Sequence, residues 1–367
     1  MVKALIIGGG VSGCIATEML TRKGWDVTAI ESTPVLGGGC RTYWWGGHPY
    51  TLGPRHFLTK SEAAWDYMRN LCPMRRYDGH EFLTYVERDQ QFYHFPIHEA
   101  EVDLMPDRDE IRAEFAARPD VSEATNLEEY WKYSVGPTLY EKFINNYSKK
   151  MWLIDDNKEI TDFAFTPKGV ALKTGPAKAA WTEAISGYPL APGGYNDWFD
   201  LCMSNATLKL NTQCEDYDIE NRRVKIAGEW HTYDVIVNTL SLEVILKNAF
   251  GELRWSGRDF YKIVLPMERC FPKDVYFLYY ANTEPFTRIV EYKVFYEYDS
   301  PTTLLGIEIP SHKNKLYPYP MKKDQDRHKQ YMDALPDGVF SIGRNGTYRY
   351  LDIGMIIEQC LELFKNV

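Results

Sequence analysis

The sequence predicts an α/β protein in which a Rossmann-like nucleotide-binding domain is interrupted by a helical insertion domain and an antiparallel β-sheet domain. Three observations predict this fold class. A strand, a glycine-rich turn, a helix and a second strand open the chain; residues 99–150 are rich in helix formers; and residues 257–310 hold several β-prone runs. A chain of 367 residues is long enough for about two or three domains.

The first element is a βαβ unit. Residues 2–7 form a continuous β-prone run, typical of a parallel strand buried on both faces, and G-G-G-V-S-G follows directly. Gly8 permits a tight turn, Gly10 lets backbone approach a pyrophosphate, and Gly13 lets the helix lie close to the strand. Glu31 ends the second strand, where a carboxylate can accept hydrogen bonds from a ribose. A tight turn without a ligand is the alternative.

The next segment decides which dinucleotide is expected. After Glu31 come a short spacer, the glycines Gly38 and Gly39, and Arg41. This order resembles the FAD-binding segment of glutathione-reductase-like flavoproteins, in which glycines pass close to the diphosphate and the arginine reaches it. FAD is therefore favoured over NAD, with a glycine-rich solvent loop as the alternative.

The later elements follow in order. A hairpin is expected at residues 81–96 around "ERDQQ", then a helical segment, then strands in "ATLKLNT", "RRVKIAG" and "YDVIVNTL", then the β-rich runs, and last a helix that begins near Asp352. We expect a FAD-binding domain at 1–75, 190–245 and 330–367, a helical domain at 97–155, and an antiparallel sheet or substrate domain at 76–96, 156–189 and 246–329.

Composition excludes several classes of function. The formal charge of −9 and the lack of long basic runs argue against nucleic-acid binding. Seven cysteines without C-x-x-C spacing suggest neither a metal site nor a disulfide framework. No run approaches the ~20 apolar residues of a membrane span. We expect a cytoplasmic protein that binds no membrane.

Six further motifs carry a resemblance to a known family. They are "LGPRHFLT", "INNYSKKMW", "APGGY", "FTRIVEYKVF", "LYPYP" and "IGRNGTYRYLDIGMII". With the N-terminal segment they make nearly the whole chain similar to the flavin-dependent UDP-galactopyranose mutases.

The resemblance implies an isomerase that interconverts the pyranose and furanose forms of a nucleotide-linked hexose. In that family the N5 atom of reduced FAD attacks the anomeric carbon, the nucleotide diphosphate leaves, and the sugar ring opens and recloses on the flavin adduct. NAD(P)H is a possible reductant and a homodimer is possible. Such a site needs cations and hydroxyls that retain the departing diphosphate.

The resemblance also implies site residues. Arg288 matches a diphosphate-binding arginine, and Tyr147, Tyr319 and Tyr350 match phosphate-contacting tyrosines. Arg344 and Asp352 match residues near the flavin. The remaining implied residues are Phe143 and Trp152 on the nucleotide side, His56 beside the flavin, and Lys173 as a diphosphate cation. Ordinary burial of the tyrosines and a surface salt bridge of Arg288 are the alternatives.

Two departures from the family pattern affect specificity. The family's H-x-F-H reads Arg55-His56-Phe57-Leu58, so the imidazoles are replaced or shifted by one. The loop that usually carries a second diphosphate arginine reads "TPKGVALKTGPAKAAW", in which Leu172 or Lys173 holds the matching position and Lys168, Lys173 or Lys178 could supply the charge. Lysine is a point donor without the fork of arginine.

Three functions therefore stay open. The first is a pyranose/furanose mutase acting on UDP-galactopyranose or another nucleotide sugar. The second is an FAD-dependent oxidase or dehydrogenase of an amine or alcohol, which the glycine-rich segment also permits. The third is a catalytically silent flavoprotein or nucleotide-sugar binder.

Overall fold

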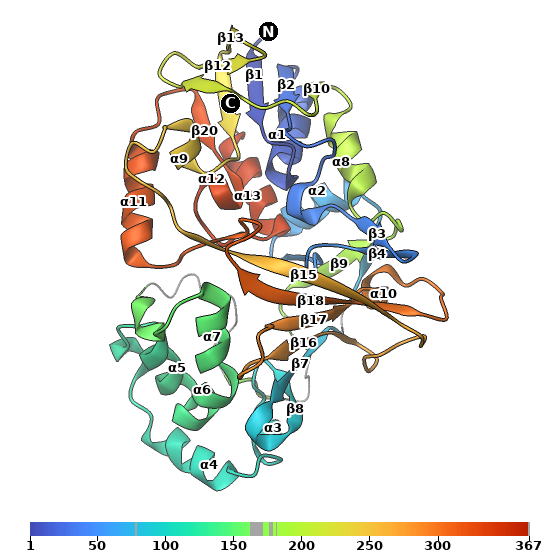
Figure 1. Ribbon diagram of the computed structural model, residues 1–367, viewed down its shortest axis with the longest axis vertical. Coiled ribbons are helices and arrows are strands. Elements are labelled where there is room, and N and C mark those ends of the chain that lie inside the picture. Colours follow the sequence, from blue (N-terminus) through green and yellow to red (C-terminus); the bar gives the residue numbers. More distant parts are fainter. Residues whose placement is uncertain (78, 162–171, 176–178, 181, 366–367) are drawn as a thin grey trace.

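This computed structural model describes residues 1–77, 79–161, 172–175, 179–180 and 182–365. Figure 1 shows three bodies, with a domain built around the N-terminal βαβ unit at the top, a long sheet across the middle and a lobe of helices at the lower left. Both chain ends lie in the top domain.

The top domain is built on a parallel sheet in the order β10-β2-β1-β14-β20. Its strands are β1 (Lys3–Ile7), β2 (Asp26–Ile30), β10 (Thr207–Lys209), β14 (Val235–Asn238) and β20 (Val339–Ser341). The central strand β1 is buried from Ala4 to Ile7, as its apolar run predicts. An antiparallel meander lies beside this sheet and comprises β11 (Asp216–Asp218), β12 (Arg223–Ile226) and β13 (Glu229–Thr232).

Helices cover the parallel sheet. Helix α1 (Val11–Arg22) packs against α8 (Asn196–Met203) and α13 (Ile353–Leu363), and α13 also packs against α2 (Glu62–Leu71). The Asp352 side chain caps α13 by accepting a 2.9 Å hydrogen bond from the Met355 amide, so the expected final helix begins where predicted. The other helices here are α9 (Leu242–Ile245), α11 (Lys322–Asp333), α12 (Gly343–Gly346) and the short η1 (Gly38–Cys40).

The middle of the molecule is a sheet in the order β19-β15-β18-β17-β16-β7-β8. Its strands are β7 (Glu81–Val86), β8 (Gln91–Phe95), β15 (Trp255–Leu265), β16 (Val275–Tyr280), β17 (Arg288–Glu291), β18 (Thr303–Ser311) and β19 (Tyr317–Pro318). All neighbours are antiparallel except β16 and β7. The expected hairpin is β7 and β8, joined by η2 (Glu87–Asp89).

The helical lobe lies below this sheet. It comprises α3 (Glu99–Val102), α4 (Arg108–Ala117), η3 (Val121–Glu123), α5 (Leu127–Val135), α6 (Pro137–Phe143), α7 (Asn145–Trp152) and η4 (Asn157–Glu159). Asn126 caps α5 by accepting from the Glu129 amide, and Pro137 starts α6 in the position that needs no amide donor. Lys142 is fully buried between Asp89 and Asp107, which ties α6 to the hairpin and to α4.

Small elements join the three bodies. A hairpin of β3 (Tyr43–Trp45) and β4 (His48–Tyr50) lies beside α10 (Lys293–Tyr296). A short antiparallel sheet is formed by β5 (Phe57–Thr59), β9 (Ile185–Pro189) and β6 (Met74–Arg76). The result is the predicted fold class, in which the parallel sheet draws its strands from residues 3–30, 207–238 and 339–341. The domain boundaries stay a prediction.

Candidate functional site

A cavity of about 570 Å³ runs between the top domain, the middle sheet and helix α7. One end lies at the glycine loops around β1 and β2, and the other at Tyr147 and Arg288. The lining residues that were predicted from the sequence are Gly8, Gly10, Glu31, Gly38, Gly39, His56, Tyr147, Arg288, Arg344, Tyr350 and Asp352. One cavity thus brings together the predicted cofactor loop and most of the predicted substrate residues.

The loop between β1 and α1 has the geometry expected of a pyrophosphate-binding turn. Gly8 has a φ of 104°, which favours glycine. A Cβ atom on Gly13 would lie 1.8 Å from the Gly8 carbonyl oxygen, so only glycine lets α1 start this close to the loop. A Cβ on Gly10 would meet nothing within 4 Å, because Gly10 faces the cavity. No side chain caps the N-terminus of α1, which leaves its first amides for an anion.

Glu31 and the second glycine loop complete this end of the cavity. The Glu31 carboxylate accepts hydrogen bonds of 2.8 Å from the amides of Gly9 and Thr33, which hold it at the end of β2. Gly38 has a φ of 50° and would place a Cβ 3.5 Å from the Cα of Gly10, so the two loops lie against each other. These residues fit a dinucleotide whose pyrophosphate crosses Gly10 and whose ribose meets Glu31.

The other end of the cavity is built on a buried ion pair. The Nε and Nη2 atoms of Arg288 donate to the two carboxylate oxygens of Glu308 at 2.8 and 2.7 Å. The Glu308 side chain is 1% exposed and that of Arg288 is 16% exposed. Burial alone would lower the pKa of Arg288, but the Glu308 carboxylate raises that pKa well above its usual value. Arg288 is therefore a fixed, permanent cation at the cavity wall.

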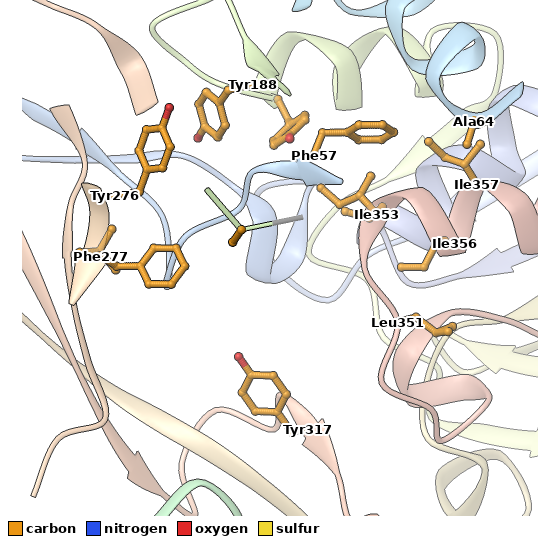
Figure 2. Close-up of a cluster of buried hydrophobic side chains, with 14 of the residues drawn as sticks. Phe57, Ala64, Tyr188, Tyr276, Phe277, Tyr317, Leu351, Ile353, Ile356 and Ile357 are labelled. Carbon is orange, nitrogen blue, oxygen red and sulfur yellow. The ribbon is translucent and has the colours of Figure 1, made fainter. Parts of the chain in front are cut away.

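Aromatic rings and further guanidinium groups surround this pair. The rings of Tyr317 and Tyr350 stack with centroids 5.5 Å apart. Arg344 lies 5.0 and 4.8 Å from these two ring centroids and donates to the Leu351 carbonyl at 3.0 and 2.7 Å. Figure 2 shows Tyr317 with its hydroxyl pointing into the space between Phe277 on one side and Leu351 on the other.

The Tyr317 hydroxyl lies in a strongly positive environment. Burial raises its pKa, but the guanidinium groups of Arg55, Arg258 and Arg288 outweigh burial and lower the pKa to about 8. This tyrosine therefore reports the excess of positive charge in the cavity. Burial instead raises the pKa of Tyr350, its stacking partner.

His56 and Tyr147 also line the cavity. Burial, and then the charges of Arg288 and Arg55, lower the pKa of His56 to about 3, so its imidazole is neutral at physiological pH. Its ring centroid lies 4.6 Å from that of His80. Tyr147, on α7, meets Tyr279 edge-on at 5.5 Å.

Several predicted residues do not line the cavity. Phe143 and Trp152 are 0% and 2% exposed and belong to the apolar core of the helical lobe. Arg41 donates to the Leu36 carbonyl at 3.2 Å. Tyr319 is a core residue whose amide donates to the Tyr348 hydroxyl. The backbone of Lys173 forms an isolated parallel β-bridge with His98, and its ammonium group contacts the Ala179 carbonyl. Gly13 lies in the first turn of α1 against the Gly8 carbonyl, and Lys168 and Lys178 lie outside the described residues.

Among the polar residues of the cavity wall that sequence reasoning missed are Arg55, Arg258, Tyr279, Glu308 and Tyr317. Two signals were present. Arg55 stands in the motif "LGPRHFLT", and Tyr317 precedes the selected Tyr319 in "LYPYP". Nothing local marks the other three, because their contacts join segments far apart in the chain.

Comparison with known proteins identifies the family. The family model for UDP-galactopyranose mutase matches residues 142–350, more than half of the chain. This chain belongs to the UDP-galactopyranose mutase family. A model for NAD(P)-binding Rossmann-like domains also matches residues 6–71. The predicted family, the fold class and the assignment to the mutase class of isomerases are thereby confirmed.

Individual relatives span nearly the full chain. A probable UDP-galactopyranose mutase from Klebsiella pneumoniae is 23% identical, covering 98% of this chain and 92% of its own length. A dTDP-fucopyranose mutase from Escherichia coli is 24% identical, covering 99% and 97%. A crystal structure of reduced UDP-galactopyranose mutase has a TM-score of 0.84 at 17% identity, covering 99% of this chain and 94% of that one.

Two features are absent from the part of the chain that the structure describes. None of the helices there is long and apolar enough to cross a membrane. Within the same residues no group of three or more His, Cys, Asp or Glu side chains is arranged to hold a metal ion.

Proposed function

We propose that this mutase interconverts the pyranose and furanose forms of a nucleotide-diphosphate hexose of the UDP-galactopyranose type, with reduced FAD as cofactor. The observation that carries the proposal is one continuous cavity with a dinucleotide loop at Gly8 and Gly10 and a fixed arginine, Arg288, at its other end. Family membership supports the ring interconversion, and two relatives carry the names of different nucleotide sugars. Their shared group is the diphosphate.

FAD fits the loop residues described above. Gly10 and the uncapped start of α1 would hold its pyrophosphate, Gly38 and Gly39 would lie along it, and Glu31 would accept from a ribose hydroxyl. When bound in its reduced form, FAD supplies the nucleophile for the anomeric carbon, so the side chains need little acid–base chemistry.

Arg288 is suited to retain the departing diphosphate. Glu308 binds its Nε and Nη2 atoms and fixes the plane of the guanidinium, so Arg288 needs no reorganisation when an anion arrives. The hydroxyls of Tyr317 and Tyr350 stand in the same part of the cavity and can donate to phosphate oxygens. Held this way, the diphosphate stays beside the sugar for the return step.

The remaining wall is largely apolar. Phe277 faces Leu351, Ile353 and Ile356 across the cavity (Figure 2). Neutral His56 adds a polar group without a charge, so it can form a hydrogen bond but cannot bind the diphosphate as a cation. An apolar wall of this kind protects an opened sugar from hydrolysis.

A panel assay tests the function. The FAD-loaded protein is reduced with dithionite and incubated without oxygen with UDP-, dTDP- and GDP-hexoses, and products are separated by chromatography. We expect a furanose isomer from at least one hexose and no net oxidation. Stoichiometric consumption of an electron acceptor would support the oxidase instead, and binding without products would support a silent binder. Both results would contradict the proposal.

Three finer points stay predictions with their own measurements. NAD(P)H as the reductant is tested by flavin bleaching under anaerobic conditions. A homodimer is tested by light scattering. A cytoplasmic location is tested by fractionation of the source cells.

A further inference from the structure

Arg258 is a buried cation in the cavity wall that the proposed function has not used. It lies on β15, its side chain is 1% exposed, and it lines the cavity. Its Nη1 atom donates to the carbonyls of Gly257 at 2.5 Å and Met151 at 3.4 Å, and its Nη2 atom contacts the Met151 sulfur. All of these acceptors are neutral.

Two other arginines, one in the same cavity wall and one close to Arg258 in the chain, are neutralised by carboxylates, whereas the half-buried Arg55 and Arg344 donate to backbone carbonyls. Arg288 forms its pair with Glu308, and Arg254, four residues before Arg258, forms a bidentate pair with Asp324. For Arg258 no aspartate or glutamate of the described residues lies within ion-pair distance. A buried charge without a counter-ion is costly, so a fold that keeps one in a cavity wall indicates an anionic ligand.

Neighbouring side chains place this charge at the end of the cavity that holds Tyr147 and Arg288. The Arg258 guanidinium lies 4.7 Å from the ring centroid of Tyr317, which stacks on Tyr350. Its contact with Met151 joins it to α7, the helix that also carries Tyr147. The glycine loop that fits the dinucleotide lies at the other end. The expected anion is therefore the diphosphate of the substrate and not that of the cofactor.

We propose that Arg258 is a second diphosphate-binding residue of this mutase, which holds the nucleotide sugar together with Arg288. The inference rests on the proposed function for the identity of the anion. It also assigns the second cation to a rigid strand, whereas the sequence pointed to Lys173, which lies outside the cavity wall. A guanidinium on β15 is in place before the substrate arrives, so the site is preorganised.

Tyr317 provides a reporter of this charge. Its hydroxyl lies in the field of three guanidinium groups, with a pKa of about 8 after the opposing effect of burial. An anion bound between Arg258 and Arg288 would cancel part of that field and return the pKa of Tyr317 toward its usual value. Absorbance of tyrosinate near pH 8 to 9 should therefore fall on anion binding.

The experiment measures binding of inorganic pyrophosphate and of UDP and dTDP to the FAD-loaded protein by calorimetry. Arg258→Met removes the charge at similar volume, and Arg258→Lys keeps the charge but not the fork. Lys262→Met is the matched control, because it removes one positive charge from the same strand outside the cavity wall. Flavin content and the tyrosinate absorbance of the wild type are recorded in parallel.

We expect Arg258→Met to weaken binding of all three ligands by about 10- to 100-fold, Arg258→Lys to weaken it less, and Lys262→Met to change it by less than about twofold. Unchanged affinity in a folded Arg258→Met protein overturns the inference, and so does a loss of FAD instead of pyrophosphate. If neither variant folds, the titration of the wild type with pyrophosphate near pH 8 to 9 decides. Tyrosinate absorbance that does not change on addition of pyrophosphate overturns the inference.

The outcome is separable from that of the proposed function. A wild type that isomerises nucleotide sugars while Arg258→Met binds pyrophosphate normally would refute only the inference. A wild type without isomerase activity whose affinity for pyrophosphate depends on Arg258 would refute only the proposed function.

Discussion

The ion pair of Arg288 and Glu308 gives the sharpest prediction on stability and activity. Arg288→Met leaves the Glu308 carboxylate, 1% exposed, without the two hydrogen bonds of 2.8 and 2.7 Å that satisfy it. Removing one member of a buried pair costs about 3 to 5 kcal/mol of unfolding free energy. The same change removes the cation that we propose binds the diphosphate, so kcat/KM should fall by about 100-fold or more.

The double variant Arg288→Met, Glu308→Gln separates the two effects. Replacing both charges with neutral groups restores most of the lost stability, because no charge stays buried and unpaired. It should not restore activity, because no guanidinium remains at that point of the wall. Flavin content should stay near wild type in both variants, since the glycine loops lie at the other end of the cavity.

The assay combines urea unfolding, followed by tryptophan fluorescence, with the isomerisation rate and the ratio of flavin to protein. Recovery of activity in the double variant would refute the role of Arg288 in diphosphate binding. Equal stability of the single and double variants would refute the buried ion pair. Parallel loss of flavin and activity would mean that Arg288 supports the cofactor instead.

Three further predictions follow from other contacts. Gly13→Ala should yield protein without flavin, because its Cβ would lie 1.8 Å from the Gly8 carbonyl oxygen; a normal 450 nm absorbance would contradict this. Pyrophosphate affinity should fall as pH rises through about 8, where Tyr317 loses its proton and its negative charge opposes the anion, and Tyr317→Phe should abolish that step; a step that persists would implicate another group. Lys142→Met should lower the unfolding free energy by about 3 to 5 kcal/mol, because it leaves the buried carboxylate of Asp89 without its ion-pair partner. A urea midpoint like that of the wild type would argue against a stabilising role of this pair.

The sequence predicts those features that depend on residues close together in the chain. The βαβ unit could be read from Gly8, Gly10, Gly13 and Glu31 because each glycine serves a turn or a close approach within a few residues. The β-rich runs predict the middle sheet because each strand is marked by residues that are neighbours in the chain. Helix α11 (Lys322–Asp333) was not anticipated, since its sequence is too polar to show an apolar stripe.

Other features of the site depend on contacts between distant segments. Arg258 contacts Met151, which is 107 residues away. Glu308 pairs with Arg288 on the adjacent strand. No local pattern therefore marks Arg258 or Glu308. In "LYPYP" the choice between Tyr317 and Tyr319 depends on which ring faces the cavity. The aromatic residues Phe143 and Trp152 could be chosen by resemblance, but only the fold shows that both are core residues.

The number of product molecules formed per reduced flavin tests the central claim most directly. The flavin is reduced once with a stoichiometric amount of dithionite, oxygen is excluded, and a nucleotide hexose is added in large excess. A mutase should make many furanose molecules per reduced flavin and leave that flavin reduced, because ring interconversion consumes no electrons. Turnover that stops after one product per flavin, or that requires oxidised flavin and an acceptor, would contradict the account.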